Sequence, residues 1–542
     1  MAKYVIGIDF GTLSARALLV ELESGREVAV SESVYAHAIL KEVGGVALPN
    51  NFALQDPQDY LDALKTTVNQ LITKNKVDYL DVIGLGIDFT TCTMLPVDKD
   101  LNPLCFKEEF KSDPHAYAKL WKHHGGEKEA DLIEQTALRR GEKWLKRYGG
   151  KVSSEYFFPK MLETFNKSRA VFDNTYCFIE AGDWLVSLLV GKIVKSNCLA
   201  GYKALWSKTD GYPTKDFWAE ISPQFADKVQ EKTVGEILSV GTKAGEITAF
   251  GQRLTGLNQG TAVAVAVGDA HSALPSANVT SGGKMMLILG TSACQIVLDK
   301  KDVSIDGICG SVVDGIIPEY VSYEAGQTCF GDAFDWVVKN TVPQSYYKEA
   351  EKLGQSIFDF ITKKADELKV GESGLLALDW FNGNRNPYFD FSLSGAILGL
   401  TLSTKPEHIY RAVVEANAYC AKRIMDLYKD NGIVVNEIVA GGGIANKSPF
   451  VMQILADVIG TKISVVDSKQ AGAKGSCIYA AAASGYYGGV KQAADAIADR
   501  CTAEYFPNKE NTEKYAKLYK EYAELSEYFA RENDLLKRIK NI

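Results

Sequence analysis

Two apolar runs in this chain end in matching glycine–threonine turns, one near the start and one about halfway along. The run 5–8 leads through Asp9 into Gly11-Thr12, and the run 287–289 leads into Gly290-Thr291. Glycine lets backbone amides approach an anion closely, and the threonine hydroxyl adds a further donor. The repeat predicts a duplicated phosphate-binding clamp, with Asp9 as a candidate Mg²⁺ ligand.

Two further apolar runs predict buried strands that each end in a carboxylate. The run 82–87 ends at Asp88 and is followed by polar residues that include Thr91, and the run 261–268 ends at Asp269. Ligands of open α/β sheets usually bind at the carboxyl ends of the strands, so these polar residues are site candidates. Spacing alone explains Asp269 equally well as the N-cap of the helix that follows.

A glycine triplet, Gly441-Gly442-Gly443, follows the apolar run 438–440 in the second half. Serine and proline are favoured as N-cap and first residue of a helix, so Ser448 and Pro449 predict a helix that continues to Val458. The strand, the turn and the positive end of the helix together predict a ligand cradle. A flexible loop is the alternative for the triplet.

Apolar residues at helical spacing predict further helices over 57–73 and 116–122. The same spacing recurs among many charges over 515–529. This last pattern is typical of a surface helix that packs on the body of a protein.

The length of 542 residues and the hydrophobic content of 46% predict two large domains, or at most four small ones. The stretch of small residues between Asp269 and Lys284 suits a hinge. We therefore expect an N-terminal domain over 1–275 with the first phosphate turn and a C-terminal domain over 284–500 with the second turn and the glycine triplet. Residues 501–542 would form a helical extension.

Charge and cysteine content narrow the functional classes. The formal net charge of −8 disfavours a general polyanion-binding surface, so nucleic acid is not an expected partner. The 10 cysteines include no Cys-x-x-Cys pair, which is typical of free thiols in a reducing cytoplasm. No apolar run approaches the roughly 18 residues of a membrane span, and we expect a soluble cytoplasmic protein without a signal peptide.

Several motifs resemble those of a known family. The segments 4–20 and 286–297 resemble the two phosphate motifs of the superfamily of sugar kinases, actin and Hsp70. Gly268-Asp269-Ala270-His271 matches the motif in which FGGY carbohydrate kinases carry their catalytic aspartate, and the motif order extends the resemblance over 4–487. It implies an α/β fold of two related actin-like ATPase (ribonuclease H-like) domains flanking a deep cleft.

Within the FGGY family, three segments are similar to L-ribulokinases. Carried across by position, the resemblance makes Asp269 the catalytic base, with Thr91, Lys203 and Glu324 as the other sugar-binding residues. Lysine donates and glutamate accepts hydrogen bonds, which suits the alternating hydroxyls of a sugar. Without the resemblance, Lys203 and Glu324 would be interpreted as surface charges. The three segments are 148–155, 197–206 and 382–385.

The resemblance also implies ATP and Mg²⁺ as cofactors. It assigns Gly290 and Thr291, together with the first phosphate turn, to the β- and γ-phosphates. Asp9 is the expected metal ligand. The remaining nucleotide-binding residues, expected at the α-phosphate and the adenosine, are Gly441, Gly442, Gly443 and Asn446; those of the first turn are Gly11 and Thr12.

The segment 121–124 resembles a Trp-Lys-x-His element near the sugar site of the family, although His123 stands where an aspartate is common. His115, His123 and His124 suggest a metal cluster, but no fourth ligand is evident. Solvent-facing helix histidines are commoner, and we predict no zinc site.

The function implied is ATP-dependent phosphorylation of L-ribulose to L-ribulose 5-phosphate, a step of arabinose catabolism, with Asp269 as general base. One alternative is a kinase for another ketopentose or polyol, such as xylulose, D-ribulose or ribitol. Another is a nucleotide-switched binding protein of the actin or Hsp70 type. The expected partners are the small-molecule sugar and ATP, and a homodimer is compatible with the sequence.

Overall fold

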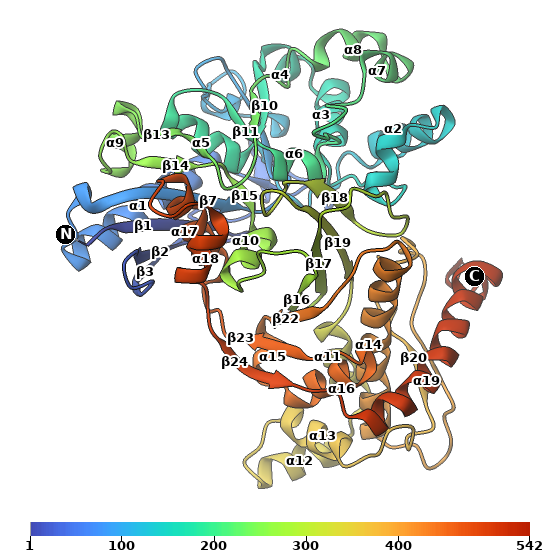
Figure 1. The fold of residues 1–542 in the computed structure, drawn as a ribbon. Coiled ribbons are helices and arrows are strands. Elements are labelled where there is room, and N and C mark those ends of the chain that lie inside the picture. The colour runs from blue at the N-terminus through green and yellow to red at the C-terminus, as the bar shows by residue number, and fades with distance from the viewer. Residues whose placement is uncertain (1, 542) are drawn as a thin grey trace. The chain divides into compact units, whose positions relative to one another are not determined.

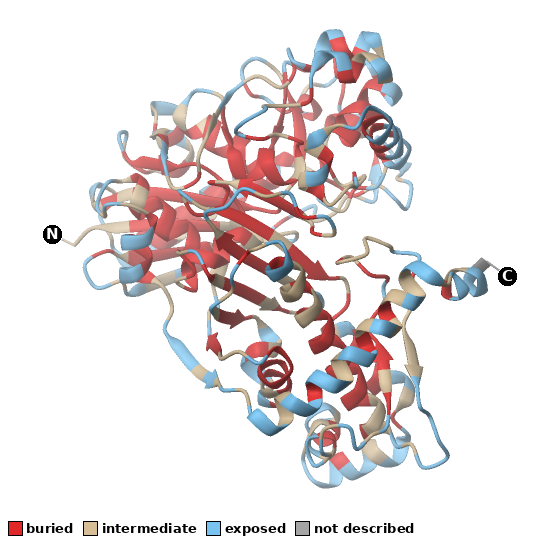
Figure 2. Ribbon diagram, turned by 45° about the vertical axis from the view of Figure 1, so that its right-hand side comes forward, coloured by how far each residue is buried: buried red, intermediate tan, exposed pale blue. Residues whose placement is uncertain are grey.

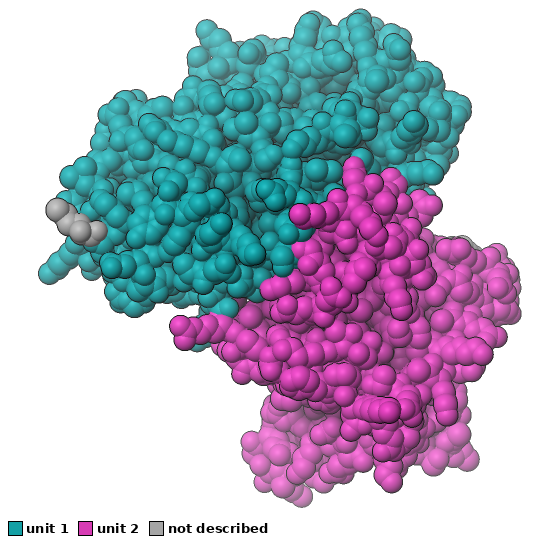
Figure 3. Space-filling view, viewed as in Figure 1, with its two compact units in different colours: residues 1–281, 311–322, 469–499 teal, residues 282–310, 323–468, 500–542 magenta. Residues whose placement is uncertain are grey.

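The computed structural model describes residues 2–541 and divides into two compact units, shown in Figure 3. The chain passes between the units more than once, so neither unit is a single continuous segment. Unit 1 consists of residues 1–281, 311–322 and 469–499, and unit 2 of residues 282–310, 323–468 and 500–542. The division at 1–275, 284–500 and 501–542 stays a prediction.

Unit 1 is built on a mixed sheet centred on β1 (Tyr4–Phe10) and β7 (Val82–Phe89), which run parallel (Figure 1). β7 is buried along nearly its whole length, as expected for an apolar strand covered on both faces. The strand order is β3 (Glu27–Val34), β2 (Ser14–Glu21), β1, β7, β14 (Ala262–Ala264) and β13 (Lys243–Glu246).

Unit 2 repeats this topology. Its first strand forms an antiparallel hairpin with the second and pairs in parallel with a later strand, as β1 does with β2 and β7. The duplicated turns of the sequence thus belong to two sheets of the same design. The order in unit 2 is β19 (Val321–Gln327), β17 (Ala293–Asp299), β16 (Lys284–Leu289), β22 (Glu437–Gly441), β23 (Ile463–Val466) and β24 (Cys501–Tyr505).

An alanine-rich helix, α17 (Ala471–Ala483), packs closely on β1 and β7 of unit 1 (Figure 1). The approach is possible because the strands present glycine to the helix. A Cβ added at Gly84 would lie 2.7 Å from the carbonyl oxygen of Ala480, and one at Gly86 would collide with that of Ser476. This packing brings the first turn of α17 to the carboxyl ends of both strands.

Buried residues fill the central strands of both sheets, as Figure 2 shows, whereas the outer strands β3 and β24 are mostly exposed or half-buried. In unit 2, α14 (Pro406–Asp430), α16 (Pro449–Ile459) and α19 (Lys509–Glu527) pack on one another. Among the described residues, no helix combines the length and apolar character needed to cross a membrane.

Most predicted helices are confirmed. The run 57–73 lies in α1 (Pro57–Asn75), and Ser448 caps α16. The C-terminal pattern over 515–529 lies in α19, where Tyr515 is buried, and ends in the π-helical turn Tyr528–Glu532.

The helix predicted over 116–122 is wrong. Pro114–Ala116 forms a short 3₁₀ turn and Ala118–Lys119 is strand β9. Ala116, Ala118 and Leu120 are all fully buried, so their spacing of two is that of an extended segment.

The strand predicted over 261–268 is interrupted. It forms β14 and then β15 (Val267–Gly268), both paired with β7. Between them, the Val265 amide donates instead to the carbonyl of Thr242, at 3.1 Å.

Candidate active site

The strand ends of unit 1 bring three aspartates to one edge of the sheet. Asp9 on β1 lies opposite Asp88 on β7, and β15 pairs with β7 so that Gly268 lies opposite Phe89. Asp269 follows at once as the first residue of α10 (Asp269–Ser276). Asp269 is close enough for its charge to raise the pKa of Asp88 further. Asp9, Asp88 and Asp269 therefore lie at the same edge of the unit 1 sheet, and the roles expected of Asp9 and Asp269 stay predictions.

Asp9 and Asp88 form a closely spaced carboxyl pair in a buried setting. Burial first, and then the Asp9 charge, hold the pKa of Asp88 well above its usual range. Burial also raises the pKa of Asp9, although the hydrogen bond with Asp88 and the charge of Arg16 oppose this. Two such carboxyls without a cation favour a form that retains a proton.

Asp88 has one satisfied and one unsatisfied oxygen. Ser476 donates to Asp88 Oδ2 at 2.7 Å, whereas Oδ1 is buried with no donor in the described part of the chain. A Cβ added at Gly472, in the first turn of α17, would lie 2.9 Å from Asp9 Cγ and 3.1 Å from Asp88 Oδ1. A glycine is therefore required where α17 meets the carboxyl pair.

Thr91 lies directly beside the start of α10. It follows β7 in a turn, and a Cβ added at Gly268 would collide with Thr91 Oγ1. Asp269 is not the N-cap of α10, because that position belongs to Gly268; its Oδ1 accepts a hydrogen bond from the Ala270 amide at 2.8 Å. The structure thus brings Thr91 next to the residue that precedes the predicted base.

Lys203 ends α6 (Asn197–Lys203), a helix anchored against α10. Its neighbour Tyr202 stacks on His271 with ring centroids 4.1 Å apart. Lys203 Nζ lies 3.6 Å from Glu155 Oε2 and 5.1 Å from the ring centroid of Tyr156. Lys203 is thus half-buried in a defined polar setting and is not a solvated surface charge.

The first phosphate turn is tightly folded in unit 1. The Gly11 amide donates to the Ser14 carbonyl at 3.0 Å, which closes the turn between β1 and β2. Trp121 Nε1 donates to Thr12 Oγ1 at 3.2 Å. The Trp121 segment and the first predicted phosphate turn are therefore neighbours, a contact that the sequence analysis did not anticipate.

The two nucleotide turns predicted for unit 2 also lie side by side. β16 and β22 run parallel with Ile288 opposite Gly441, so Gly290 and the glycine triplet follow adjacent strand ends. The Gly331 amide, at the start of α11 (Gly331–Thr341), donates to the Gly290 carbonyl at 3.0 Å. The Phe330 amide donates to the Thr291 carbonyl at 2.8 Å.

The glycine triplet is a defined turn and not a flexible loop. Gly442 has a φ of 97°, and a Cβ there would collide with the Leu289 carbonyl. A short helix, α15 (Gly443–Lys447), follows, and Asn446 Nδ2 donates back to the Gly442 carbonyl at 3.1 Å. The structure therefore agrees with the turn predicted after the strand, whereas its role in binding a ligand stays a prediction.

Glu324, on β19, is the one predicted sugar-side residue that belongs to unit 2. It is half-buried, and Cys294 Sγ on the neighbouring β17 lies 3.7 Å from its Oε1. Burial and then the Glu324 charge hold the pKa of Cys294 well above its usual range. Glu324 is thus set among defined neighbours within unit 2.

Comparison with known proteins assigns the family. Residues 4–275 match the N-terminal domain, and residues 285–484 the C-terminal domain, of the FGGY family of carbohydrate kinases. The chain belongs to the FGGY family of carbohydrate kinases. It is therefore a sugar kinase, and the alternative of an actin- or Hsp70-type binding protein falls away.

Curated relatives of this FGGY kinase align along almost its entire length. A protein named ribulokinase from Bacillus licheniformis is 45% identical over 537 residues, which cover 98% of this chain and 97% of the relative. Another ribulokinase, from Mycolicibacterium smegmatis, is 41% identical over 543 residues, covering 99% and 96%.

Solved structures share the fold of the FGGY kinase at lower identity. A gluconate kinase from Lactobacillus acidophilus superposes with a TM-score of 0.79 at 18% identity, covering 98% of this chain and 99% of that one. A xylulose kinase from Rhodospirillum rubrum gives 0.78 at 21%, covering 97% and 99%. These neighbours establish an α/β fold of two ribonuclease H-like, actin-like domains.

The carboxylates of the FGGY kinase fit a magnesium ion. In the described residues, no group of three or more histidine, cysteine, aspartate or glutamate side chains is arranged to hold a metal. Mg²⁺, however, is usually held by one or two carboxylates together with substrate phosphates and water. Asp9 and the unsatisfied Oδ1 of Asp88 supply such a pair of oxygens.

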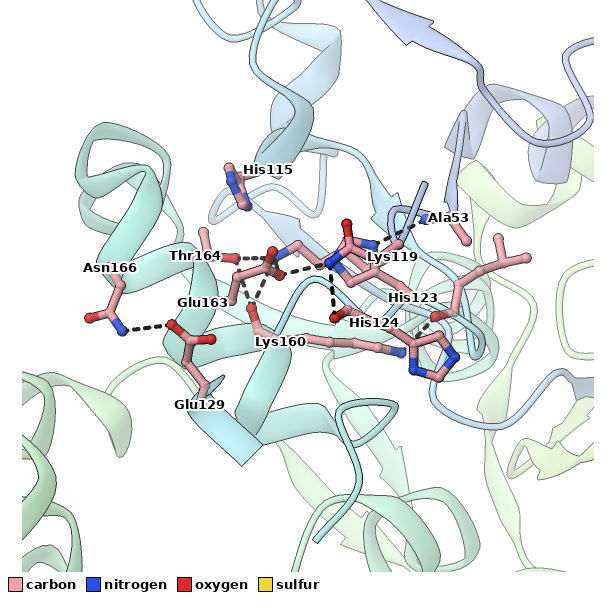
Figure 4. Close-up of polar contacts among 12 residues, drawn as sticks. Ala53, His115, Lys119, His123, His124, Glu129, Lys160, Glu163, Thr164 and Asn166 are labelled. Atoms are coloured by element: carbon pink, nitrogen blue, oxygen red, sulfur yellow. Dashed lines mark hydrogen bonds and ion pairs between the residues drawn. The ribbon is translucent and has the colours of Figure 1, made fainter. Parts of the chain in front are cut away.

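Sequence reasoning missed a buried polar group next to the sugar-side segments. Figure 4 shows Lys119, His123 and Thr164 around the Glu163 carboxylate. Lys119 Nζ lies 2.6 Å and His123 Nε2 3.0 Å from Glu163 Oε2, and Lys119 Nζ donates to Thr164 Oγ1 at 2.8 Å. The clue in the sequence was the histidine in place of the usual aspartate at position 123.

The expectation that the histidines face solvent on a helix is wrong for His115 and His123. Both are buried, and burial lowers the pKa of His115 to about 3 and that of His123 to about 4. The Ala53 amide donates to His123 Nδ1, so the neutral ring carries its proton on Nε2 and donates it to Glu163.

A cavity of about 390 Å³ lies in unit 2, away from the predicted nucleotide turns. None of the predicted nucleotide-binding residues lines it. Some of its lining side chains bond one another: Arg411 donates to the Tyr515 hydroxyl at 3.0 Å, and Lys514 donates to Glu510 at 2.8 Å. It has the character of a polar groove between helices, and we assign it no part in the chemistry.

Proposed function

We propose that this FGGY kinase transfers the γ-phosphoryl group of ATP to the terminal hydroxyl of L-ribulose, producing L-ribulose 5-phosphate and ADP. Asp269 acts as the general base. The observation that carries the choice of sugar is the alignment, over 96–100% of this chain, with relatives named ribulokinase at 38–45% identity. The gluconate and xylulose kinases of similar fold are only 18–21% identical.

The proposed base is supported by its place at the strand edge. Asp269 follows β15, with Thr91 beside Gly268 and Lys203 on the helix that packs against α10. Lys203 would donate to sugar hydroxyls and Glu324 would accept from them. The terminal hydroxyl of the sugar gives its proton to Asp269 while the hydroxyl oxygen forms a bond to the γ-phosphorus. At the same time the bond between the γ-phosphorus and the β–γ bridging oxygen breaks, which releases ADP.

The nucleotide would be held by backbone amides and small side chains of the turns. These turns are Gly11-Thr12, Gly290-Thr291 and Gly441–Gly443, with Asn446 on α15. Asp9, backed by Asp88, would hold Mg²⁺, which supplies charge compensation for the phosphates when bound. Asp9 and Asp88 would then give up the proton they share.

A cytoplasmic location is part of the proposal, since ATP is required and none of the 10 cysteines, all of which lie in the described residues, forms a disulfide. A homodimer remains a prediction that light scattering on the purified protein would check.

A sugar panel tests the proposed function. The purified chain is assayed by ADP release with L-ribulose, D-ribulose, D-xylulose, ribitol and glycerol at several concentrations, and kcat/KM is compared. We expect L-ribulose to give the highest value. A higher kcat/KM for D-xylulose or glycerol would refute the assignment, and ADP release that no sugar changes would refute kinase activity toward this panel.

A further inference from the structure

The turn that carries Thr91 adopts an unusual backbone conformation. It connects β7 with β8 (Met94–Val97), and the Thr93 amide donates to the Thr90 carbonyl at 3.2 Å. Cys92 occupies the third position of this turn with a φ of 66°. A residue with a side chain is rarely stable in this left-handed region unless its surroundings hold it there.

Two charged side chains hold Cys92 from opposite sides of its backbone. Its amide donates to Glu180 Oε2 at 2.6 Å, and its carbonyl accepts from Lys160 Nζ at 2.6 Å. Glu180 ends β10 (Cys177–Glu180), and Lys160 lies on α3 (Phe157–Lys167). The peptide groups before and after Cys92 are therefore both held by short hydrogen bonds to ionisable side chains.

Lys160 also reaches a second turn of the site region. Its Nζ donates to the Leu120 carbonyl at 2.7 Å, one residue before Trp121. Trp121 in turn contacts Thr12 of the phosphate turn. One ammonium thus joins the turn of Thr91 to the turn of Trp121.

Burying these two ionisable side chains costs folding free energy. Lys160 is fully buried, and burial lowers its pKa although the charge of Glu180 opposes this. Glu180 is also buried, and burial raises its pKa to about 7. Burying an ammonium and a carboxyl far from solvent costs several kcal/mol per ion. A methionine at position 160 would fill similar space without that cost.

We infer that Lys160 and Glu180 are positioning residues for the acceptor sugar. They hold the Thr91–Cys92 peptide in its left-handed turn, and so keep the Thr91 side chain against Gly268 at the start of α10. The inference rests on the proposed function, because it makes Thr91 part of the wall of the sugar site. Lys160 itself acts through the backbone and does not touch the substrate.

The test compares Lys160→Met with Lys232→Met. Lys232 is a matched control: it is a buried lysine of unit 1 whose ammonium also donates to backbone carbonyls, those of Thr175 at 2.5 Å and Asp173 at 3.4 Å. It contacts no predicted site residue. Both variants lose an ammonium from a dry environment, so a general loss of stability should appear in both.

Two readouts separate positioning from folding. Hydrogen exchange of the amides of 91–93 is measured in the protein without ligands, and KM is measured separately for L-ribulose and for ATP. For Lys160→Met we expect exchange at least about tenfold faster than in Lys232→Met. We also expect the KM for L-ribulose to rise about 10- to 100-fold while the KM for ATP changes less than about twofold.

A second pair of variants keeps the inference testable if Lys160→Met folds poorly. Glu180→Gln retains an acceptor for the Cys92 amide and should behave as wild type. Glu180→Leu removes the acceptor without touching Lys160, and should reproduce the fast exchange and the selective rise in sugar KM.

The inference is overturned if Lys160→Met matches Lys232→Met in both readouts, or if the KM values for sugar and ATP rise equally. Slow exchange in Glu180→Leu would overturn it as well. If the wild type does not phosphorylate L-ribulose at all, the proposed function fails, whereas the exchange data still decide whether the two side chains hold the turn.

Discussion

Replacing His123 with glutamine should make unit 1 less sensitive to mild acid. His123 is fully buried, accepts from the Ala53 amide through Nδ1 and donates to Glu163 through Nε2. Burial lowers its pKa from 6.5 to about 4, against the opposing effect of Glu163; the charges of Lys119 and Lys160 lower it further. Glutamine offers the same acceptor and donor but does not titrate.

The direction of the pH dependence of stability follows from the lowered pKa of His123. The unfolded chain binds a proton at His123 below about pH 6.5, whereas the folded chain does so below about pH 4. The stability linked to His123 is therefore complete above pH 6.5 and is lost as the pH falls toward 4. With these two pKa values, about 2 kcal/mol is lost between pH 7 and pH 5, which is roughly a 20-fold change in the unfolding equilibrium.

Urea unfolding at pH 7 and pH 5 measures this effect. Five of the 7 tryptophans lie in residues 1–281, so tryptophan fluorescence reports mainly on unit 1. His115 has a pKa of about 3 and should destabilise both proteins equally in acid, so it cancels from the comparison. The wild type should therefore lose about 2 kcal/mol more than His123→Gln between the two pH values.

An equal loss of stability in the wild type and in His123→Gln between pH 7 and pH 5 would refute the reasoning, since it would mean that His123 is not held neutral in the folded state. A larger loss in the variant would refute it too. His124→Gln is the matched control, because it removes an exposed histidine one residue away that bonds Ser154 and leaves the buried His123–Glu163 contact in place.

Two further changes test the site itself. Asp269→Asn should lower kcat about 10²- to 10⁴-fold with little change in the free energy of unfolding, because the base is lost while the shape of the side chain is kept. Asp173→Asn, at a surface aspartate, is the control. Normal turnover in Asp269→Asn would remove Asp269 from the proposed role. Asp88→Asn should raise the Mg²⁺ concentration needed for half-maximal activity by about tenfold or more, and weaken Mn²⁺ binding in the presence of ADP as followed by electron paramagnetic resonance. Unchanged Mn²⁺ binding would show that Asp88 does not support the metal.

Local sequence patterns were sufficient for much of the fold. The strands that carry Asp9, Asp88 and Gly441 were predicted because apolar runs, glycine turns and N-cap residues act over a few neighbours. The segment 116–122 failed because the buried spacing of two was interpreted as a helix. Pairing with β6 (Leu54–Gln55) and β8 decided its conformation, and both partners are distant in sequence.

The sequence by itself determined the residue types of the site, the order of its motifs and the duplicated turns, because these depend on short segments. The tertiary structure alone decided which charges meet. Asp88 became the partner of Asp9, 79 positions away, through the parallel register of β1 and β7. Lys160 came to hold Cys92, 68 positions away, because α3 packs beside that turn. The role of a buried charge depends on the partners that replace water around it, and only folding supplies those partners.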